Sequence, residues 1–255
     1  MRFTGRIARA AVMVALATIT AAGCGGDGDS TAESGQMPDA VKTQLSAVAG
    51  VGVDSTILTA TGSSVAVYQA PGAAGATPTP KLRLANPNDN GAKLVFLVTA
   101  KMPGWWQVLL PVQPNGSTGW VKAEQVSAST TPYRIVVSRG QHTLTLYKAG
   151  ASIAVEKVAI GTSDTPTPGG QFYLAELLKP PNPNGPYGPY AFGLNGFSTA
   201  LTSFEGQDPV IGIHGTNQPQ LLGQDVSHGC IRLSNDAIIR LAGTVPTGTP
   251  VDIIA

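Results

Sequence analysis

Near the C-terminal end, the chain carries one cysteine and two histidines whose spacing could support covalent chemistry. Cys230 ends the run Ser227-His228-Gly229-Cys230, and His214 lies sixteen positions before it. A thiol is a good nucleophile only as the thiolate, and a nearby imidazole can take its proton or hold an ion pair that lowers its pKa. The two residues therefore predict a cysteine enzyme with Cys230 as nucleophile.

Two other interpretations of Cys230 are open from the residue types alone. A lone cysteine is by default a small buried hydrophobic residue without a chemical role. Cys230 could also be a zinc ligand, although no Cys/His pairs at zinc-finger spacing support this. The ligands would then be Cys230, His214, His228 and either Asp225 or Asp208. Two histidines near the cysteine, in a chain with only three, favour catalysis.

The segments around the two residues should position them. Residues 209–214 are apolar and predict a strand that delivers the histidine at its end. Gly229 directly precedes Cys230, and its missing side chain lets a substrate approach and leaves backbone N–H groups free to face an oxyanion. Ser234 is placed to cap a helix over residues 235–242. The nucleophile is therefore expected just before a capped helix.

The rest of the C-terminal half reads as short strands joined by turns. Alternating apolar residues predict strands over 133–138, 143–148, 152–160, 171–177 and 250–254. Residues 179–196 contain five prolines and four glycines, so we predict a long surface loop without a ladder or helix. Tyr190 in this loop is a candidate substrate-binding residue. The loop itself is either a lid beside the site or a surface loop without a functional role.

The first 23 residues have the composition of a bacterial secretion signal. Arginines at positions 2, 6 and 9 precede a short apolar run, and small residues lead to Cys24. This order resembles a bacterial lipoprotein signal, in which Cys24 would become the acylated N-terminus, although Ala21 stands where a larger aliphatic residue is usual. Residues 24–56 then read as a polar tether.

Charge and cysteine content restrict the partners and the compartment. Without residues 1–23 the chain keeps 13 basic and 15 acidic residues, a formal charge of −2. Electrostatic attraction would therefore not bind it to nucleic acid or to an anionic membrane surface. If Cys24 is lipidated, Cys230 has no disulfide partner and persists as a free thiol. We expect an exported protein of the bacterial cell envelope, lipid-anchored to the outer face of the plasma membrane, or secreted if Cys24 is not acylated.

Residues 57–127 form a second series of short β segments. The predicted strands are 65–68, 94–98, 105–110 and 119–121. The runs around Trp105-Trp106 and Trp120 resemble bacterial Src-homology-3-like barrels of cell-wall proteins, so a small β-barrel domain is expected. The tryptophans are either barrel core or an aromatic face that binds the wall. A Ser/Thr-rich linker over residues 128–132 would separate this domain from residues 132–255.

The full C-terminal string resembles a known enzyme family. His214-Gly215-Thr216, followed by Ser227-His228-Gly229-Cys230-Ile231-Arg232-Leu233, is similar to the active-site signature of the L,D-transpeptidases, the peptidoglycan cross-linking cysteine enzymes. The resemblance extends back through Thr165-Pro166-Thr167-Pro168 to about Tyr133. It implies a catalytic β-sandwich with one clear helix after the cysteine, in a chain that is mainly β.

The resemblance implies a role for each matched residue. Cys230 would be the nucleophile, and His214 the general base and acid. Ser227, His228 and Gly229 would shape the pocket, and backbone groups around Gly229 and Cys230 would form the oxyanion hole. His228 could rival His214 as base, since residues two apart on an extended backbone share a face.

The implied reaction is acyl transfer without metal or cofactor. Cys230 attacks the third residue of a peptidoglycan stem tetrapeptide, D-Ala leaves, and the side-chain amine of a second stem completes a 3→3 cross-link. Carbapenems are expected to acylate Cys230. Arg232 suits a stem-peptide carboxylate or a structural ion pair. With water or a lipoprotein amine as acceptor the site would be an L,D-carboxypeptidase or a lipoprotein-attaching enzyme, and a non-catalytic wall-binding lipoprotein is the alternative of another class.

One position departs from the family pattern. Some members carry serine after the first histidine, proposed to orient its imidazole, whereas this chain has Gly215. The orientation of His214 is therefore expected to come from a backbone carbonyl or from another side chain.

Overall fold

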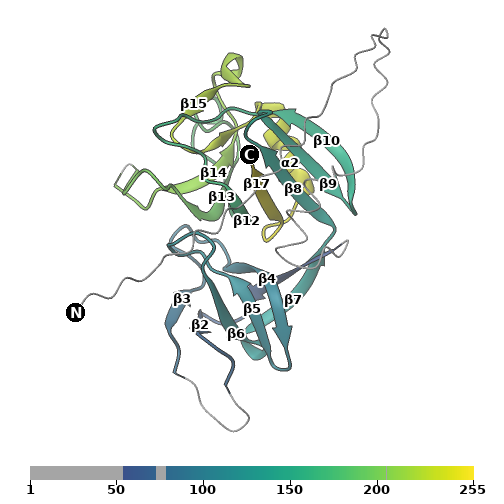
Figure 1. Cartoon of the computed structure of the whole chain (residues 1–255), viewed down its shortest axis with the longest axis vertical. Coiled ribbons are helices and arrows are strands. Elements are labelled where there is room, and N and C mark those ends of the chain that lie inside the picture. The colour runs from purple at the N-terminus through teal and green to yellow at the C-terminus, as the bar shows by residue number, and fades with distance from the viewer. Residues whose placement is uncertain (1–53, 73–78, 205) are drawn as a thin grey trace, which may run out of the picture. The chain divides into compact units, whose positions relative to one another are not determined.

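The structure is a computed structural model that describes residues 54–72, 79–204 and 206–255. In these ranges the chain forms β-strands with a single α-helix and two short 3-10 helices (Figure 1), which confirms the prediction of a mainly β protein. The predicted signal peptide, Cys24 and the tether up to residue 53 lie outside the described residues. Ser55 and Thr56, the predicted end of the tether, already belong to the first strand.

The first seven strands form one antiparallel sheet in the order β3-β2-β6-β5-β4-β1-β7. They are β1 (Ser55–Ala60), β2 (Ser64–Tyr68), β3 (Leu82–Ala85), β4 (Val95–Met102), β5 (Trp105–Leu109), β6 (Thr118–Lys122) and β7 (Val126–Thr131), with the 3-10 helix η1 (Ala123–Gln125) between the last two. The four strands predicted in this region correspond to β2, β4, β5 and β6. The sequence prediction missed β1, β3 and β7.

The predicted linker over residues 128–132 is wrong, because β7 runs through it. β7 pairs with β1 from Ser55 opposite Thr131 to Ala60 opposite Val126. Most of β7 is exposed and it lies at the edge of its sheet. Hydroxyl-bearing residues suit such a strand, since β-branched threonine fits an extended backbone and its polar group stays in water.

The tryptophans of the first sheet are half-buried. Their burial is therefore intermediate between that of barrel-core residues and that of an exposed aromatic face that binds the wall. Trp106 packs against the sheet's apolar core, and the Lys101 ammonium lies 4.6 Å from its ring centroid. Trp105 meets Tyr68 edge to face, with centroids 5.1 Å apart. Binding of the wall by these rings stays a prediction.

The C-terminal strands form an eight-stranded sheet in the order β10-β9-β8-β17-β12-β13-β14-β16. They are β8 (Tyr133–Ser138), β9 (Thr143–Lys148), β10 (Ala151–Lys157), β12 (Gly170–Leu178), β13 (Ala191–Phe197), β14 (Val210–His214), β16 (Ile231–Arg232) and β17 (Pro250–Ile254). Two short strands, β11 (Ile160–Gly161) and β15 (Asp225–Ser227), pair in parallel beside it. The 3-10 helix η2 (Pro219–Leu221) and the helix α2 (Asn235–Thr244) complete this region.

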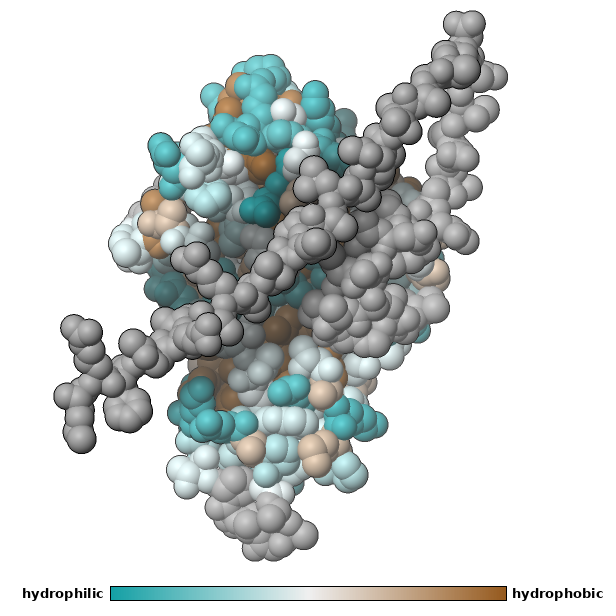
Figure 2. Space-filling view, viewed as in Figure 1, coloured by the Kyte–Doolittle hydropathy of each residue, from teal (hydrophilic) through white to brown (hydrophobic). Residues whose placement is uncertain are grey.

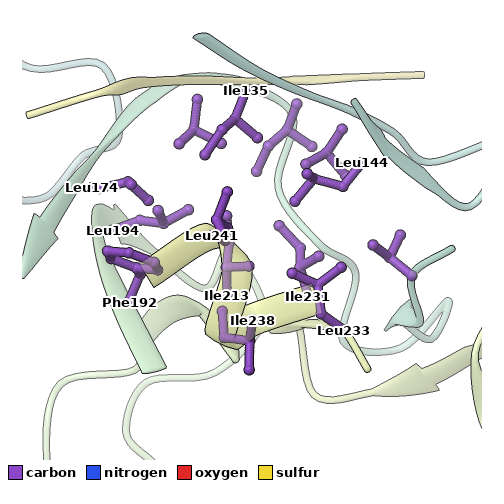
Figure 3. Close-up of a cluster of buried hydrophobic side chains, with 14 of the residues drawn as sticks. Ile135, Leu144, Leu174, Phe192, Leu194, Ile213, Ile231, Leu233, Ile238 and Leu241 are labelled. Atoms are coloured by element: carbon purple, nitrogen blue, oxygen red, sulfur yellow. The ribbon is translucent and has the colours of Figure 1, made fainter. Parts of the chain in front are cut away.

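The helix α2 closes the core of the C-terminal sheet. The Ser234 hydroxyl accepts a hydrogen bond from the Ala237 N–H at 3.2 Å, so the predicted cap is confirmed. Ile238 and Leu241 of α2 are buried in the same apolar cluster as strand residues such as Ile213 (Figure 3). This packing fixes the helix against β14, which carries His214, and β16, which Cys230 directly precedes.

The predicted loop over residues 179–196 is wrong in its last third. Residues 191–197 form β13, which pairs with both β12 and β14 in the interior of the sheet. Its glycines make room for neighbouring side chains rather than break the strand, because a Cβ on Gly196 would lie 2.3 Å from the Phe172 ring. The irregular loop therefore covers only residues 179–190.

All described residues fall in a single compact unit of the chain. The face shown in Figure 2 mixes hydrophilic side chains with weakly and strongly hydrophobic ones over these residues. In the described part of the chain, no helix has the length and apolar character needed to cross a membrane.

Candidate active site

His214 and Cys230 come from neighbouring parallel strands. His214 is the last residue of β14 and lies opposite Arg232 of β16, while Cys230 directly precedes β16. The Cys230 Sγ accepts a hydrogen bond from the Gly212 N–H at 3.4 Å. Because alternate residues of a strand point to the same face, the thiol and the imidazole lie over one face of β14, two residues apart.

Ser227 and Thr167 hold the turn that presents the cysteine. The Ser227 hydroxyl donates to the Cys230 carbonyl at 2.6 Å and accepts from the Gly229 N–H at 3.1 Å. The Thr167 hydroxyl donates to the Gly229 carbonyl at 2.8 Å. Gly229 has a φ of 116°, and a Cβ there would approach Ile211 to 2.9 Å, so glycine is needed in this turn.

Burial sets the protonation of both candidate catalytic groups. Burial lowers the pKa of His214 to about 4, although its hydrogen bond to Gly215 opposes this shift. Burial also raises the pKa of the Cys230 thiol, against the effects of the Gly212 N–H and the Arg232 charge. Both shifts favour the uncharged form, so the resting site holds a thiol and a neutral imidazole rather than the ion pair considered from the sequence.

A backbone carbonyl orients the His214 ring. The His214 Nδ1 lies 2.6 Å from the Gly215 carbonyl oxygen, which can only accept, so Nδ1 carries the proton. In the neutral ring, Nε2 is then the nitrogen that can take a proton. The Tyr187 ring also contacts the imidazole, with centroids 4.9 Å apart and planes at 61°.

The two groups line a pocket of about 220 Å³. Besides His214 and Cys230, its lining residues are Pro186, Tyr187, Ser198, Leu201, Phe204, Pro209, Val210, Ile211, Ser227, His228 and Arg232. His228 is exposed and lies against Phe204, with ring centroids 6.0 Å apart. His228 is in a bend rather than on a strand, so the shared face expected for His228 and Cys230 does not form.

Tyr190 does not line this pocket, and its contact with substrate stays a prediction. It packs at the edge of the apolar core, with the Lys179 ammonium 5.7 Å from its ring, and its carbonyl accepts from the Gly215 N–H at 3.3 Å. Tyr187 of the same loop lies beside the His214 ring instead. The two tyrosines lie in the same proline-rich loop, and sequence alone gave no signal to choose between them.

Arg232 has no structural ion pair in the described ranges. Its Nε is buried without a hydrogen-bond partner among the described residues, and the side chain lines the pocket. The structural ion pair considered for Arg232 is therefore not observed, and its guanidinium keeps capacity for an anion.

Of the residues of the zinc alternative, Cys230, His214 and His228 line one pocket, but neither Asp225 nor Asp208 joins them there. Asp225 instead meets His142, with 2.7 Å between its Oδ1 and the His142 Nε2. Among the described residues, no three His, Cys, Asp or Glu side chains come together in a way that could hold a metal ion.

Comparisons with known proteins identify the family. The model of the YkuD L,D-transpeptidase catalytic domain matches residues 132–253. The putative L,D-transpeptidase YkuD of Bacillus licheniformis is 37% identical over 154 residues, which cover 58% of this chain and 85% of that protein. The chain belongs to the L,D-transpeptidase family.

Other family members are similar over the same region. The putative L,D-transpeptidase YkuD of Bacillus subtilis is 40% identical over 124 residues, which cover 49% of this chain and 67% of that protein. An L,D-transpeptidase from Mycobacterium smegmatis has 17% sequence identity and a TM-score of 0.41 over 63% of this chain and 90% of that structure.

The packing around Gly215 explains why this L,D-transpeptidase lacks the serine seen in some members. A Cβ on Gly215 would lie 2.4 Å from the Asn235 Oδ1 and 3.0 Å from the Gly188 Cα. Asn235 at the start of α2 is held in place, because its Oδ1 accepts from the Thr216 N–H at 2.9 Å. The 179–190 loop and α2 thus fill the space that a side chain would need.

Replacing Gly215 with Ser is expected to impair this L,D-transpeptidase rather than restore a family feature. The new Cβ would force Asn235 or the Gly188 backbone to move, and overpacking of this kind costs about 1–3 kcal/mol. We expect a lower melting temperature and slower acylation of the thiol by a carbapenem, measured by calorimetry and intact-protein mass. A Gly243→Ser variant is the control, since a Cβ there meets nothing within 4 Å. Unchanged melting and acylation in Gly215→Ser would contradict this account.

Proposed function

We propose that the protein forms 3→3 peptidoglycan cross-links through a thioester on Cys230. One observation supports this most directly: Cys230 and His214 lie over the same face of β14 and line one pocket. This arrangement gives a nucleophile and a base within one enclosed space, which is what two-step acyl transfer needs.

In the first step, the His214 Nε2 takes the thiol proton as the sulfur attacks the carbonyl carbon of the third stem residue. A C–S bond forms, the bond to the terminal D-Ala nitrogen breaks, and the imidazolium returns its proton to that nitrogen. Because thiol and imidazole are both neutral at rest, deprotonation accompanies attack instead of preceding it.

In the second step, the side-chain amine of another stem opens the thioester. A C–N bond forms, the C–S bond breaks, His214 takes the amine proton and the thiol is restored. If water attacks in place of the amine, the product is a shortened tripeptide, and the same site acts as an L,D-carboxypeptidase.

Two groups are proposed to handle negative charge during these steps. Arg232 binds the terminal carboxylate of the donor peptide, since its buried Nε has no partner among the described residues. The Cys230 N–H faces the oxyanion, because the Gly229 N–H, the other donor expected there, is bound to the Ser227 hydroxyl. Ser227 and Gly229 therefore act by shaping the turn.

The proposal also includes the cell envelope as the site of action. An exported, lipid-anchored protein at the outer face of the plasma membrane would meet peptidoglycan stems as they are assembled, and the cysteine-preceding signal at Cys24 motivates this. Metabolic labelling with a fatty-acid analogue tests it: label that disappears in a Cys24→Ser variant is expected. Label that persists would contradict lipidation at that residue.

The reaction is tested by incubating the full chain with a disaccharide tetrapeptide and following the products by mass spectrometry. A cross-linked dimer that has lost one D-Ala is the expected product. Tripeptide without dimer would instead identify an L,D-carboxypeptidase. No change in the substrate would contradict both.

The lowered pKa of His214 predicts an unusual pH profile. The base must be neutral to accept a proton, so a pKa of about 4 keeps it competent well below neutral pH. The second-order rate constant for acylation by imipenem should stay near its neutral value at pH 5 and fall about tenfold per pH unit below about 4. Intact-mass kinetics from pH 2.5 to 8 measure this. Half-maximal acylation near pH 6.5 would contradict it.

A further inference from the structure

A second groove lies next to the active-site pocket, between the N-terminal sheet and β12 to β14. Its volume is about 350 Å³, larger than the pocket that holds Cys230. Val210 lines both spaces and is 42% exposed. Gly212 of β14 contacts the Cys230 sulfur. Val210 lies two residues before Gly212 on the same strand, a distance of about 7 Å along the extended backbone. A peptide lying in the groove could therefore extend along β14 to the thiol.

The groove has an excess of negative charge. Its charged lining residues are Asp89, Glu176, Asp208 and Lys93. Glu176 is only 9% exposed, and its carboxylate accepts from the Asn88 Nδ2 at 2.7 Å and the Asn90 Nδ2 at 3.0 Å. These partners are neutral amides, and no ion pair within the described ranges includes Glu176. Its charge is thus held in place without compensation, which favours a cationic ligand.

A second observation is independent of the carboxylates. Tyr173 also lines the groove, and its side chain is fully buried. Its hydroxyl has no hydrogen-bond partner among the described residues. A buried hydroxyl without a partner is unfavourable, so a peptide that displaces the groove wall and brings an amide to this hydroxyl would be bound more tightly.

We propose that this groove binds the acceptor of the transfer reaction, a peptide with a protonated side-chain amine. The inference rests on the proposed function and adds where the second substrate lies. Asp208 and Glu176 attract and hold the ammonium group before transfer. The group gives one proton to water as it leaves the carboxylates, and the neutral amine moves along Val210 to the thioester. There His214 takes a second proton and passes it to the departing sulfur. The donor enters the pocket from the Arg232 side, so the two peptides do not compete for space.

The chemistry also predicts which acceptors fail. A peptide whose side-chain amine is acetylated keeps its shape but lacks the charge. A neutral glycan has no group for the carboxylates to hold. Neither should bind in this groove as well as the free amine.

Calorimetric titration of the full wild-type chain, without a donor, tests the site apart from catalysis. The probes are the N-terminally acetylated tripeptide L-Ala-γ-D-Glu-L-Lys, whose lysine side chain is its only amine, and the same peptide with that side chain also acetylated. The free amine should bind at least about tenfold more tightly, a difference of about 1.4 kcal/mol. The double variant Asp208→Asn/Glu176→Gln should lose this preference, and Asp54→Asn, an exposed carboxylate outside the groove, should keep it.

Three results would overturn the proposal: equal binding of both peptides, a preference that survives in the double variant, or displacement of the peptide by a neutral chitin oligosaccharide. If the double variant does not fold, the single variant Asp208→Asn is used, because Asp208 is exposed and its replacement should not disturb the fold. The proposal then requires that the preference for the free amine over the acetylated peptide fall by about threefold or more. Acylation of the wild-type thiol by imipenem tests the proposed function separately. A negative titration result therefore counts against the groove proposal, and a failure of acylation counts against the proposed function.

Discussion

Replacing Cys230 with Ala should abolish the covalent adduct with imipenem and all dimer formation from the disaccharide tetrapeptide. The reaction needs a sulfur that can both attack a carbonyl and leave again, and an alanine methyl group can do neither. Replacement with Ser should leave less than about one part in a thousand of the acylation rate, because a hydroxyl is far harder to deprotonate by a neutral imidazole. Intact-protein mass after incubation with the carbapenem measures both variants.

The chain provides its own control for this experiment. Cys24 is the only other cysteine in the sequence, so Cys24→Ser should form the imipenem adduct at the wild-type rate. The Cys230→Ala protein should melt within a few degrees of the wild type, since the sulfur's hydrogen bond from the Gly212 N–H at 3.4 Å is weak, sulfur being a poor acceptor. An adduct that forms equally on Cys230→Ala would show that another residue is the nucleophile.

Much of the catalytic half could be predicted because its strands carry local signals. The alternation of apolar residues predicted β8, β9 and β17 with the bounds that the structure has, and the serine before α2 predicted its cap. Each of these signals comes from neighbours along the chain. They required no knowledge of what packs against them.

The elements that were missed depend on contacts between distant residues. Gly196 reads as a strand breaker until Phe172 is seen to lie over it, and the Ser/Thr run of β7 reads as a linker until β1 is seen to pair with it. The same holds in the site. Thr167 and Tyr187 are far from Cys230 in sequence, and only the fold brings them to the turn and to the His214 ring.

Burial changed the expected electrostatics most. The sequence places a histidine near a cysteine, which is compatible with a thiolate-imidazolium pair. In the structure, burial disfavours both charges, so the pair is neutral at rest. No sequence pattern reports this, because it depends on how completely strands, loop and helix enclose the two groups. The role of His214 is therefore that of a base which acts during attack.

This role predicts the effect of replacing His214 with Asn. Asparagine can hydrogen-bond but cannot take the thiol proton, so acylation by imipenem at neutral pH should fall by roughly 10² to 10⁴-fold. Hydroxide can replace the missing base, and the rate constant of the variant should then rise about tenfold per pH unit above neutrality. The wild-type rate should stay nearly constant over the same range. Intact-mass kinetics at several pH values measure both profiles.

The rival histidine gives the matched comparison. His228 is exposed against Phe204, whereas His214 is buried with its Nδ1 fixed by the Gly215 carbonyl. The rate of acylation by imipenem should therefore fall less than about tenfold in a His228→Asn variant, and the wild-type pH profile should remain. The reason is that the buried His214 ring, held in one tautomer, is still present to act as the base, and the solvated His228 ring does not serve in its place. A larger loss in His228→Asn, or a flat pH profile in His214→Asn, would transfer the role of base to His228.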